Sequence, residues 1–275
     1  MAAVLDIHLL CMENKHLEAF NHALTKYFLH TQSSLPPPFK LHTHTVSLSQ
    51  LSATRGGNNI SFDLMVSPAN SFGRLDGGFD DAISRALSPK KDYFAVTRKA
   101  QEVLRKEWRG YAPPGTCTLM EVDEDWSNEE IHGEHKSPNV WSCKWIALCP
   151  TMRTPMDVKW DREVVYECIW SLLCAVDKHN RGVDAVGEKG AQGEAGTHSG
   201  KITSMLMSPM ATGCGMVSPK RWAEQTVLAI KHWIEMGEVK QEGDGISWME
   251  IRKISKDVAE TWRKRDGDTG TYTLD

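Results

Sequence analysis

Short apolar or alternating runs are separated along the chain by longer segments in which apolar residues recur at helical spacing. The short runs, bounded by turn residues, predict strands over 4–12, 40–51, 60–66, 115–122, 140–150 and 202–210. The longer segments predict helices over 14–29, 78–87, 92–110, 162–180 and 219–236. Strands that alternate with helices predict an α/β fold around a central mixed or parallel sheet.

Two stretches do not follow this alternation. Residues 181–201 contain many glycines and no apolar periodicity, so we expect a flexible surface insertion there. The tail from Gly237 is charged, and 246–264 within it is predicted to be a short helix or a docked extension. We therefore expect one domain over 1–236 and a charged C-terminal extension over 237–275.

The composition is that of an ordinary globular protein. The chain has 275 residues, of which 40% are hydrophobic and 25% charged, which is enough for one large core or two small ones. A net charge of -4 gives no electrostatic reason to expect non-specific binding of nucleic acid. This balance leaves room for a small anionic ligand held by a local site. Three tryptophans on predicted helices are expected to pack in the core: Trp170, Trp222 and Trp233.

The seven cysteines are odd in number and include no C-x-x-C pair, which favours reduced thiols over disulfides or a zinc site. The first apolar run contains acids and histidine, unlike a signal peptide, and no apolar run is long enough to span a membrane. We therefore expect an intracellular, reducing location, cytoplasmic or nuclear or both, with no membrane partner.

Two predicted strands run into glycine-bearing turns that open helices. These turns read VSPANSFGRLDGGFDDAI over 66–83 and MSPMATGCGMVSPKRWA over 207–223. Backbone N–H groups at such turns, with a helix N-terminus behind them, suit phosphate oxygens. Neither turn has the spacing of a P-loop or of the G-x-G-x-x-G fingerprint. Each alone could be a plain connection, but two on one sheet favour a diphosphate site.

Both turns resemble the two ligand-binding loops of macro domains. A third stretch, LCPTMRTPMDV over 148–158, is similar to a macro-like branch that includes fungal proteins proposed to act on ADP-ribose 1″-phosphate. Order and spacing agree across the three stretches, and the resemblance covers about Val4 to Met236 and is strongest in the two loops. The resemblance implies a three-layer α/β/α sandwich with a mixed sheet. It also implies ADP-ribose or a derivative as ligand, with no cofactor required and an ADP-ribosylated protein as a further possible partner.

The resemblance assigns binding residues within each turn. The first turn would lie along the distal ribose and the second along the diphosphate, while the arginine within the third stretch could pair with a terminal phosphate. The implied binding residues are Ala69, Asn70, Ser71, Gly77, Gly78, Phe79, Arg153, Thr212, Gly213, Cys214, Gly215 and Met216.

Three residues are candidates for catalysis. Asn70 could orient a water, Asp80 could act as a base or position that water, and His135 could donate a proton to the leaving oxygen. Each has a non-catalytic alternative. Asn70 could close its own turn, Asp80 could stabilise a helix N-terminus, and His135 could be a solvated loop histidine. Weaker candidates of the same kind are Asp76, Asp81 and His132.

Other reactive residues in the sequence are expected to have no catalytic or metal-binding role. Cys214 has no histidine beside it in sequence, so we expect no covalent catalysis. His42 and His44 would share one face of a strand, but they lack a third ligand at a suitable spacing, so we expect no metal site.

The sequence departs from the macro domain pattern at one recognition position. Many macro domains have an Asp that reads the adenine amine, and Ser49 stands about where it should be, which leaves adenine selectivity open. Three functions remain: hydrolysis of ADP-ribose 1″-phosphate, binding of free or protein-linked ADP-ribose without turnover, and a degenerate macro fold that binds a protein through its tail.

Overall fold

The computed structural model describes most of the chain, with gaps between the described ranges. These ranges are 5–29, 39–51, 54–55, 58–123, 126, 130–131, 134–135, 139–189, 200–238, 245–265 and 272–274. Within them, no helix is both long and apolar enough to cross a membrane.

A six-stranded mixed sheet forms the centre of the molecule, with the strand order β2-β1-β10-β5-β9-β6. All neighbouring strands are parallel except β6, which runs antiparallel to β9 at one edge. The strands are β1 (Leu5–Leu10), β2 (Phe39–His44), β5 (Leu64–Ser67), β6 (Thr118–Glu121), β9 (Trp145–Leu148) and β10 (Ser204–Met207). The predicted mixed sheet is confirmed.

In the described part of the chain, six α-helices accompany this sheet. They are α1 (Asn14–Leu24), α2 (Gly78–Leu87), α3 (Ala95–Trp108), α4 (Val164–Lys189), α5 (Pro219–Glu238) and α6 (Trp248–Ala259). Shorter elements are a π-helix (Thr25–Leu29), a 3-10 helix (Leu48–Gln50), and the strand pairs β3 (Thr54–Arg55) with β4 (Asn58–Asn59), β7 (Glu130–Ile131) with β8 (Glu134–His135), and β11 (Arg263–Arg265) with β12 (Tyr272–Leu274).

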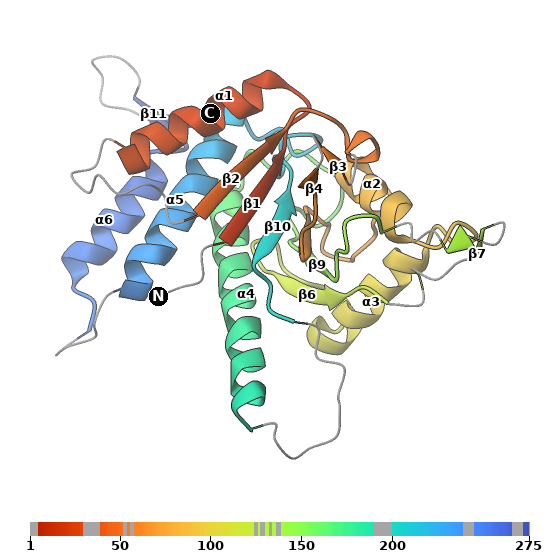
Figure 1. Ribbon diagram of the computed structural model, residues 1–275. Coiled ribbons are helices and arrows are strands. Elements are labelled where there is room, and N and C mark those ends of the chain that lie inside the picture. The colour runs from red at the N-terminus through yellow and green to blue at the C-terminus, as the bar shows by residue number, and fades with distance from the viewer. Residues whose placement is uncertain are drawn as a thin grey trace.

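Helices cover both faces of the sheet and enclose two separate hydrophobic cores (Figure 1). One core joins the sheet to α1, α4 and α5, and it includes Phe20, Ile169 and the fully buried Trp222. The other core joins the sheet to α2 and α3, through Ile83 and Leu104. Successive side chains of a strand point to opposite faces, so strands buried on both sides are apolar throughout. This arrangement is the expected three-layer α/β/α sandwich.

Only one of the three tryptophans expected in the core is fully buried. Trp222 packs against Phe20, with ring centroids 5.6 Å apart. Trp233 is partly buried against the same core. Trp170 stacks instead on Tyr166, with centroids 6.0 Å apart.

Several predicted boundaries were wrong. The strand predicted over 40–51 ends at His44, because Ser47 and Gln50 form a capping box that starts a 3-10 turn. The helix predicted to end at residue 180 continues to Lys189, so the irregular segment does not begin at Arg181. An i,i+4 ion pair between Asp177 and Arg181, 2.9 Å apart, supports this extra length. Residues 190–199 of the predicted insertion lie outside the described residues.

The C-terminal segment packs on the rest of the molecule. The predicted boundary at Gly237 falls inside α5, and the predicted helix in the tail is α6. Trp262, after α6, is 7% exposed, and its Nε1 donates to Glu163 Oε1 at 3.1 Å. Gln225 Nε2 of α5 donates to Thr261 Oγ1 at 3.0 Å. The tail is thus both helical and docked.

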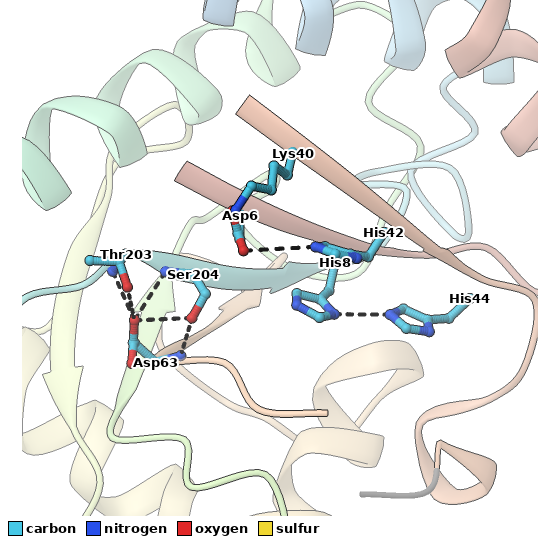
Figure 2. A network of polar contacts seen from close by, with 8 residues as sticks. All are labelled: Asp6, His8, Lys40, His42, His44, Asp63, Thr203 and Ser204. Carbon is cyan, nitrogen blue, oxygen red and sulfur yellow. Dashed lines mark hydrogen bonds and ion pairs between the residues drawn. The ribbon is translucent and has the colours of Figure 1, made fainter. Parts of the chain in front are cut away.

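One carboxylate joins the central strands β5 and β10 (Figure 2). Asp63 Oδ2 accepts hydrogen bonds from the backbone N–H and the hydroxyl group of both Thr203 and Ser204, at 2.8–3.0 Å. Asp63 N in turn donates to Ser204 Oγ at 3.0 Å. These bonds fix where the two strands begin, and so bring their carboxyl ends side by side.

Candidate functional site

Three loops follow neighbouring parallel strands and meet at one edge of the sheet. We call residues 66–80, after β5, the first loop, and residues 208–219, after β10, the second loop. Residues 149–158, after β9, are the PTMR loop. Because β10, β5 and β9 are adjacent and parallel, their carboxyl ends point to the same edge. Ligands of open α/β sheets bind at this edge.

Hydrogen bonds join the PTMR loop to the first loop. Thr151 N donates to Ala69 O at 3.0 Å, and Ser71 N donates to Met152 O at 2.9 Å. Asn70 and Met152 form an isolated parallel bridge. The buried residues Ala69 and Ser71, predicted to bind ligand, therefore brace the loop from beneath.

The second loop contacts the PTMR loop from the other side. Cys214 Sγ lies 3.7 Å from Met152 Sδ, and Val158 N donates to Gly215 O at 3.0 Å. The PTMR loop thus contacts both glycine loops. The structure therefore brings together the three stretches that the sequence singled out.

The Asn70 side chain closes the first loop. Its Oδ1 accepts from the backbone N–H groups of Phe72, at 3.1 Å, and Arg74, at 3.3 Å, while its Nδ2 donates to Arg74 O at 2.6 Å. Asn70 therefore has the turn-closing role that the sequence offered as the alternative to catalysis. An amide has two donor protons, however, and the second has no acceptor among the described residues. Asn70 can therefore hold its loop and still donate to a ligand hydroxyl.

Asp80 points into the protein. Only 7% of it is exposed, and Ser67 Oγ donates to its Oδ1 at 2.7 Å. Burial raises the pKa of Asp80 to about 7, although the hydrogen bond from Ser67 acts in the opposite direction, and the nearby charge of Asp76 raises the pKa further. This carboxyl can therefore gain or lose a proton near neutral pH. The sequence did not single out Ser67, because its partner lies 13 residues ahead and is brought to it only by the fold.

The glycine pair of the first loop leaves a helix N-terminus open. Gly77 is the N-cap of α2 and no side chain caps this helix end. The N–H groups of Gly78 and Phe79 have no acceptor within the described part of the chain. A Cβ atom added at Gly77 or Gly78 would meet no atom within 4 Å, so solvent reaches this backbone. Such a terminus favours an anion.

The second loop has a strained backbone around its glycines. Ala211 and Met216 both adopt a φ of 58°, in the left-handed region that side chains disfavour. A Cβ atom at Gly215 would lie 2.4 Å from Ala211 O, so only glycine fits there. A Cβ atom at Gly213 would meet nothing within 4 Å. Between these strained positions, the N–H groups of Gly213 and Cys214 have no acceptor among the described residues.

The remaining predicted residues of the two loops differ in exposure. Arg153 and Cys214 are exposed, and Met216 is 56% exposed. Thr212 Oγ1 is used within the loop, because it donates to Pro209 O at 3.0 Å. The ring of Phe79 packs against the second core, so only its backbone faces the open helix end.

The histidine candidates cannot be placed at the site. His132 and the side chain of His135 lie outside the described residues, so His135 stays a prediction. Asp76 forms an ion pair with Arg74, at 2.6 Å, and Asp81 bonds to Arg85, at 2.8 Å. These partners give Asp76 and Asp81 local structural roles.

His42 and His44 share a strand face, as predicted, and a third histidine joins them (Figure 2). His8 of β1 stacks on His42, with ring centroids 4.6 Å apart, and its Nδ1 lies 3.0 Å from His44 Nε2. Burial lowers the pKa of His8 to about 4, helped by His42 and His44. Within the described ranges, no group of three or more metal-binding side chains could hold an ion.

Ser49 takes part in the capping network of the 3-10 helix. It is exposed, and its Oγ lies 3.0 Å from Ser47 Oγ, which itself donates to Gln50 Oε1 at 2.9 Å. Its hydroxyl is thus already engaged within the turn.

A large groove lies away from the three loops. It has a volume of about 860 Å³ and runs between the edge strand β6, the end of α3 and the outer half of α4, lined among others by Trp108, Cys117, Trp145, Cys174 and Lys178. The backbone N–H groups without an acceptor described above lie in the loops.

Comparisons with known proteins give a fold likeness only. No family model matches the chain, and no curated protein matches it. Similar solved structures include the Oceanobacillus iheyensis macrodomain with ADP, with 15% identity and a TM-score of 0.38 over 72% of this chain and 84% of that one. Others are the same protein with MES bound (15% identity, TM-score 0.38, 73% and 85% covered) and a point mutant with ADPR (13%, 0.38, 72% and 86%). Identity this low does not determine the ligand of this chain.

Proposed function

We propose that this protein binds ADP-ribose or a derivative at the three loops and hydrolyses ADP-ribose 1″-phosphate to ADP-ribose and phosphate. The observation that carries the proposal is the pairing of two sets of open backbone N–H groups at one sheet edge, in loops whose sequences resemble those of macro domains. Such donors suit the oxygens of a diphosphate.

Each loop has a distinct part in binding. The N–H groups of Gly213 and Cys214 hold the diphosphate, and the open terminus of α2 adds donors from Gly78 and Phe79. The second amide proton of Asn70 is available for a hydroxyl of the distal ribose. Arg153, exposed beside Ser71, is within the same group of loops and supplies a cation for a terminal phosphate.

Hydrolysis requires a water directed at phosphorus and a proton for the leaving ribose oxygen. Asp80 is proposed to orient that water from beneath the loop, since its carboxyl exchanges protons near neutral pH. His135 is proposed as the proton donor. No metal or cofactor is part of this proposal.

A phosphate-release assay with ADP-ribose 1″-phosphate tests the catalytic part. We expect wild-type protein to release phosphate, and Asn70→Ala and Asp80→Asn proteins to lose at least about tenfold in kcat, as for other groups that position reactants. Melting temperatures of the variants show whether they are folded. A wild-type protein that binds ADP-ribose and never releases phosphate contradicts hydrolysis.

The burial of Asp80 favours one alternative, a reader of free or protein-linked ADP-ribose without turnover. A carboxyl that is 7% exposed and bonded to Ser67 is poorly placed to touch a substrate. Calorimetric binding of ADP-ribose with no product after prolonged incubation would support this reader.

A further inference from the structure

Three thiols gather beneath the candidate site. Cys117 precedes β6, Cys149 follows β9, and Cys168 lies on α4. In the antiparallel ladder of these strands, Thr118 is opposite Leu148. One residue further along the same register, Cys117 faces Cys149 across the strands.

The side chains of Cys117 and Cys149 are on the same face of the sheet, because directly opposite residues of an antiparallel pair share a face. The pKa of Cys149 is raised well above its usual value, first by a hydrogen bond with Cys117 and then by burial. Cys168 is oriented differently, because its Sγ donates to Pro150 O at 3.3 Å. All three are free thiols. The geometry therefore selects Cys117 and Cys149 as the pair able to bond.

Only one member of the pair can be reached from solvent. Cys149 is fully buried, whereas Cys117 is partly exposed and lines the groove of about 860 Å³ beside β6. Lys178 lines the same groove, where it can attract a carboxylate. The groove therefore offers a small thiol reagent a path to Cys117.

Cys149 also begins the segment that holds the first loop. Its N–H donates to Ser67 O at 2.9 Å, and Thr151 and Met152 then bond to the loop. Its thiol lies close enough to Asp80 to be affected by the charge of that carboxyl. A displacement of Cys149 would thus also move the residues that support the candidate site.

We propose that Cys117 and Cys149 form a reversible disulfide by exchange with a small peptide disulfide of the glutathione type that enters the groove. The Cys117 thiolate attacks one sulfur of the small disulfide, whose S–S bond breaks and releases one small thiol. The Cys149 sulfur then attacks the Cys117 sulfur and displaces the second small thiol, and the proton of the Cys149 thiol passes to the departing sulfur. Two protein thiols are oxidised, one small disulfide is reduced, and the protein's two thiol protons are taken up by the released thiols.

Formation of this bond changes the candidate site. Opposite side chains in an antiparallel pair have Cβ atoms about 5 Å apart, and a disulfide needs about 3.8 Å, so the strands must close by about 1 Å. Cys149 would move with the segment that holds the first loop. If the proposed function is correct, on which this step rests, oxidation weakens ADP-ribose binding by about tenfold, the loss of about one good hydrogen bond.

Peptide mapping of the full-length protein tests the disulfide without any ligand. Reduced protein is incubated with oxidised glutathione, trapped with an alkylating reagent and digested. We expect a bond between Cys117 and Cys149 in wild type, and a glutathione adduct that stops at Cys117 in Cys149→Ala. Cys174→Ser is the matched control, since Cys174 lines the same groove and its loss should leave the bond intact.

The outcomes separate this proposal from the proposed function. A wild-type protein that stays reduced, stops at the Cys117 adduct, or joins Cys117 to Cys168 contradicts the disulfide. If the bond forms and is reversed by dithiothreitol, calorimetry with ADP-ribose follows on both forms. Unchanged affinity contradicts the link to the site, whereas no binding by either form contradicts the proposed function and leaves the disulfide established.

Discussion

Single backbone positions determine the shape of the second loop. Gly215 has the Ala211 carbonyl oxygen where a Cβ atom would be, while Gly213, two residues earlier, faces open space. The sequence showed both glycines but could not rank them, because the difference depends on how the loop folds back on itself. One glycine is needed for folding, and the other is free to serve a ligand.

Substitution of these two glycines should have different effects. Gly215→Ala forces a backbone clash, and we expect it to lower the free energy of unfolding by about 2 kcal/mol, as overpacked sites do. Gly213→Ala should leave stability within about 0.5 kcal/mol but obstruct a diphosphate, weakening ADP-ribose binding by about tenfold. Urea denaturation and calorimetry measure the two quantities. Equal stability of the two variants would contradict this description of the loop.

Asp80 gives stability a predictable dependence on pH. Its pKa is about 7 in the folded protein against an ordinary value of 3.8, so the folded state binds the proton more tightly than the unfolded state. Its contribution is therefore fully present below pH 3.8 and is lost as the pH rises toward 7. Asp80→Asn should remove this loss. The free energy of unfolding of the variant relative to wild type should therefore rise by at most about 4 kcal/mol between pH 4 and pH 8.

Denaturation of Asp80→Asn and wild type at several pH values checks this prediction. Asp81→Asn is the control, because its hydrogen bonds to Arg85 and Tyr93 lower the pKa of Asp81. Asp81→Asn should have the opposite effect: it should lower the free energy of unfolding, and most strongly at high pH. A difference between Asp80→Asn and wild type that does not vary with pH would show that Asp80 is not titrating as a buried acid.

At the scale of elements, apolar periodicity located the strands and helices but not all their ends. The strand predicted over 40–51 is shorter because a capping box starts a 3-10 turn after it. The alternation of apolar and polar residues does not predict such local hydrogen bonds. The helix α4 continues past residue 180 through a glycine-containing stretch. There, ion pairs such as Asp184 with Lys201, 2.6 Å apart, stabilise the helix. The glycine content of this stretch had predicted an irregular segment instead.

The docking of α6 can be tested with its two tryptophans. Trp262 is 7% exposed and bonded to Glu163, whereas Trp248 at the start of α6 is 73% exposed. We expect Trp262→Ala to lower the free energy of unfolding by about 3 kcal/mol, as for a buried aromatic, and Trp248→Ala to change it by less than about 0.5 kcal/mol. If chemical denaturation gives similar values for both, α6 is not an integral part of the fold.

At the scale of the whole molecule, the strand order creates the candidate site. The three loops follow strands that are far apart in the sequence, and they meet only because β9, β5 and β10 are neighbours. The sequence motifs indicated a two-loop site, but the bonds of the PTMR loop to the first loop depend on the pairing of β5 with β9, which periodicity does not determine. The thiol pair beneath the site is hidden from sequence for the same reason.

The central claim is that these loops form a binding site for ADP-ribose, and calorimetric titration tests it most directly. Wild-type protein is titrated with ADP-ribose and, separately, with AMP, with Gly213→Ala protein as the matched control for the second loop. The account predicts saturable binding of ADP-ribose to wild type, tighter than that of AMP, and about tenfold weaker in the variant. Absence of heat with ADP-ribose, or equal affinity in wild type and Gly213→Ala, would contradict it.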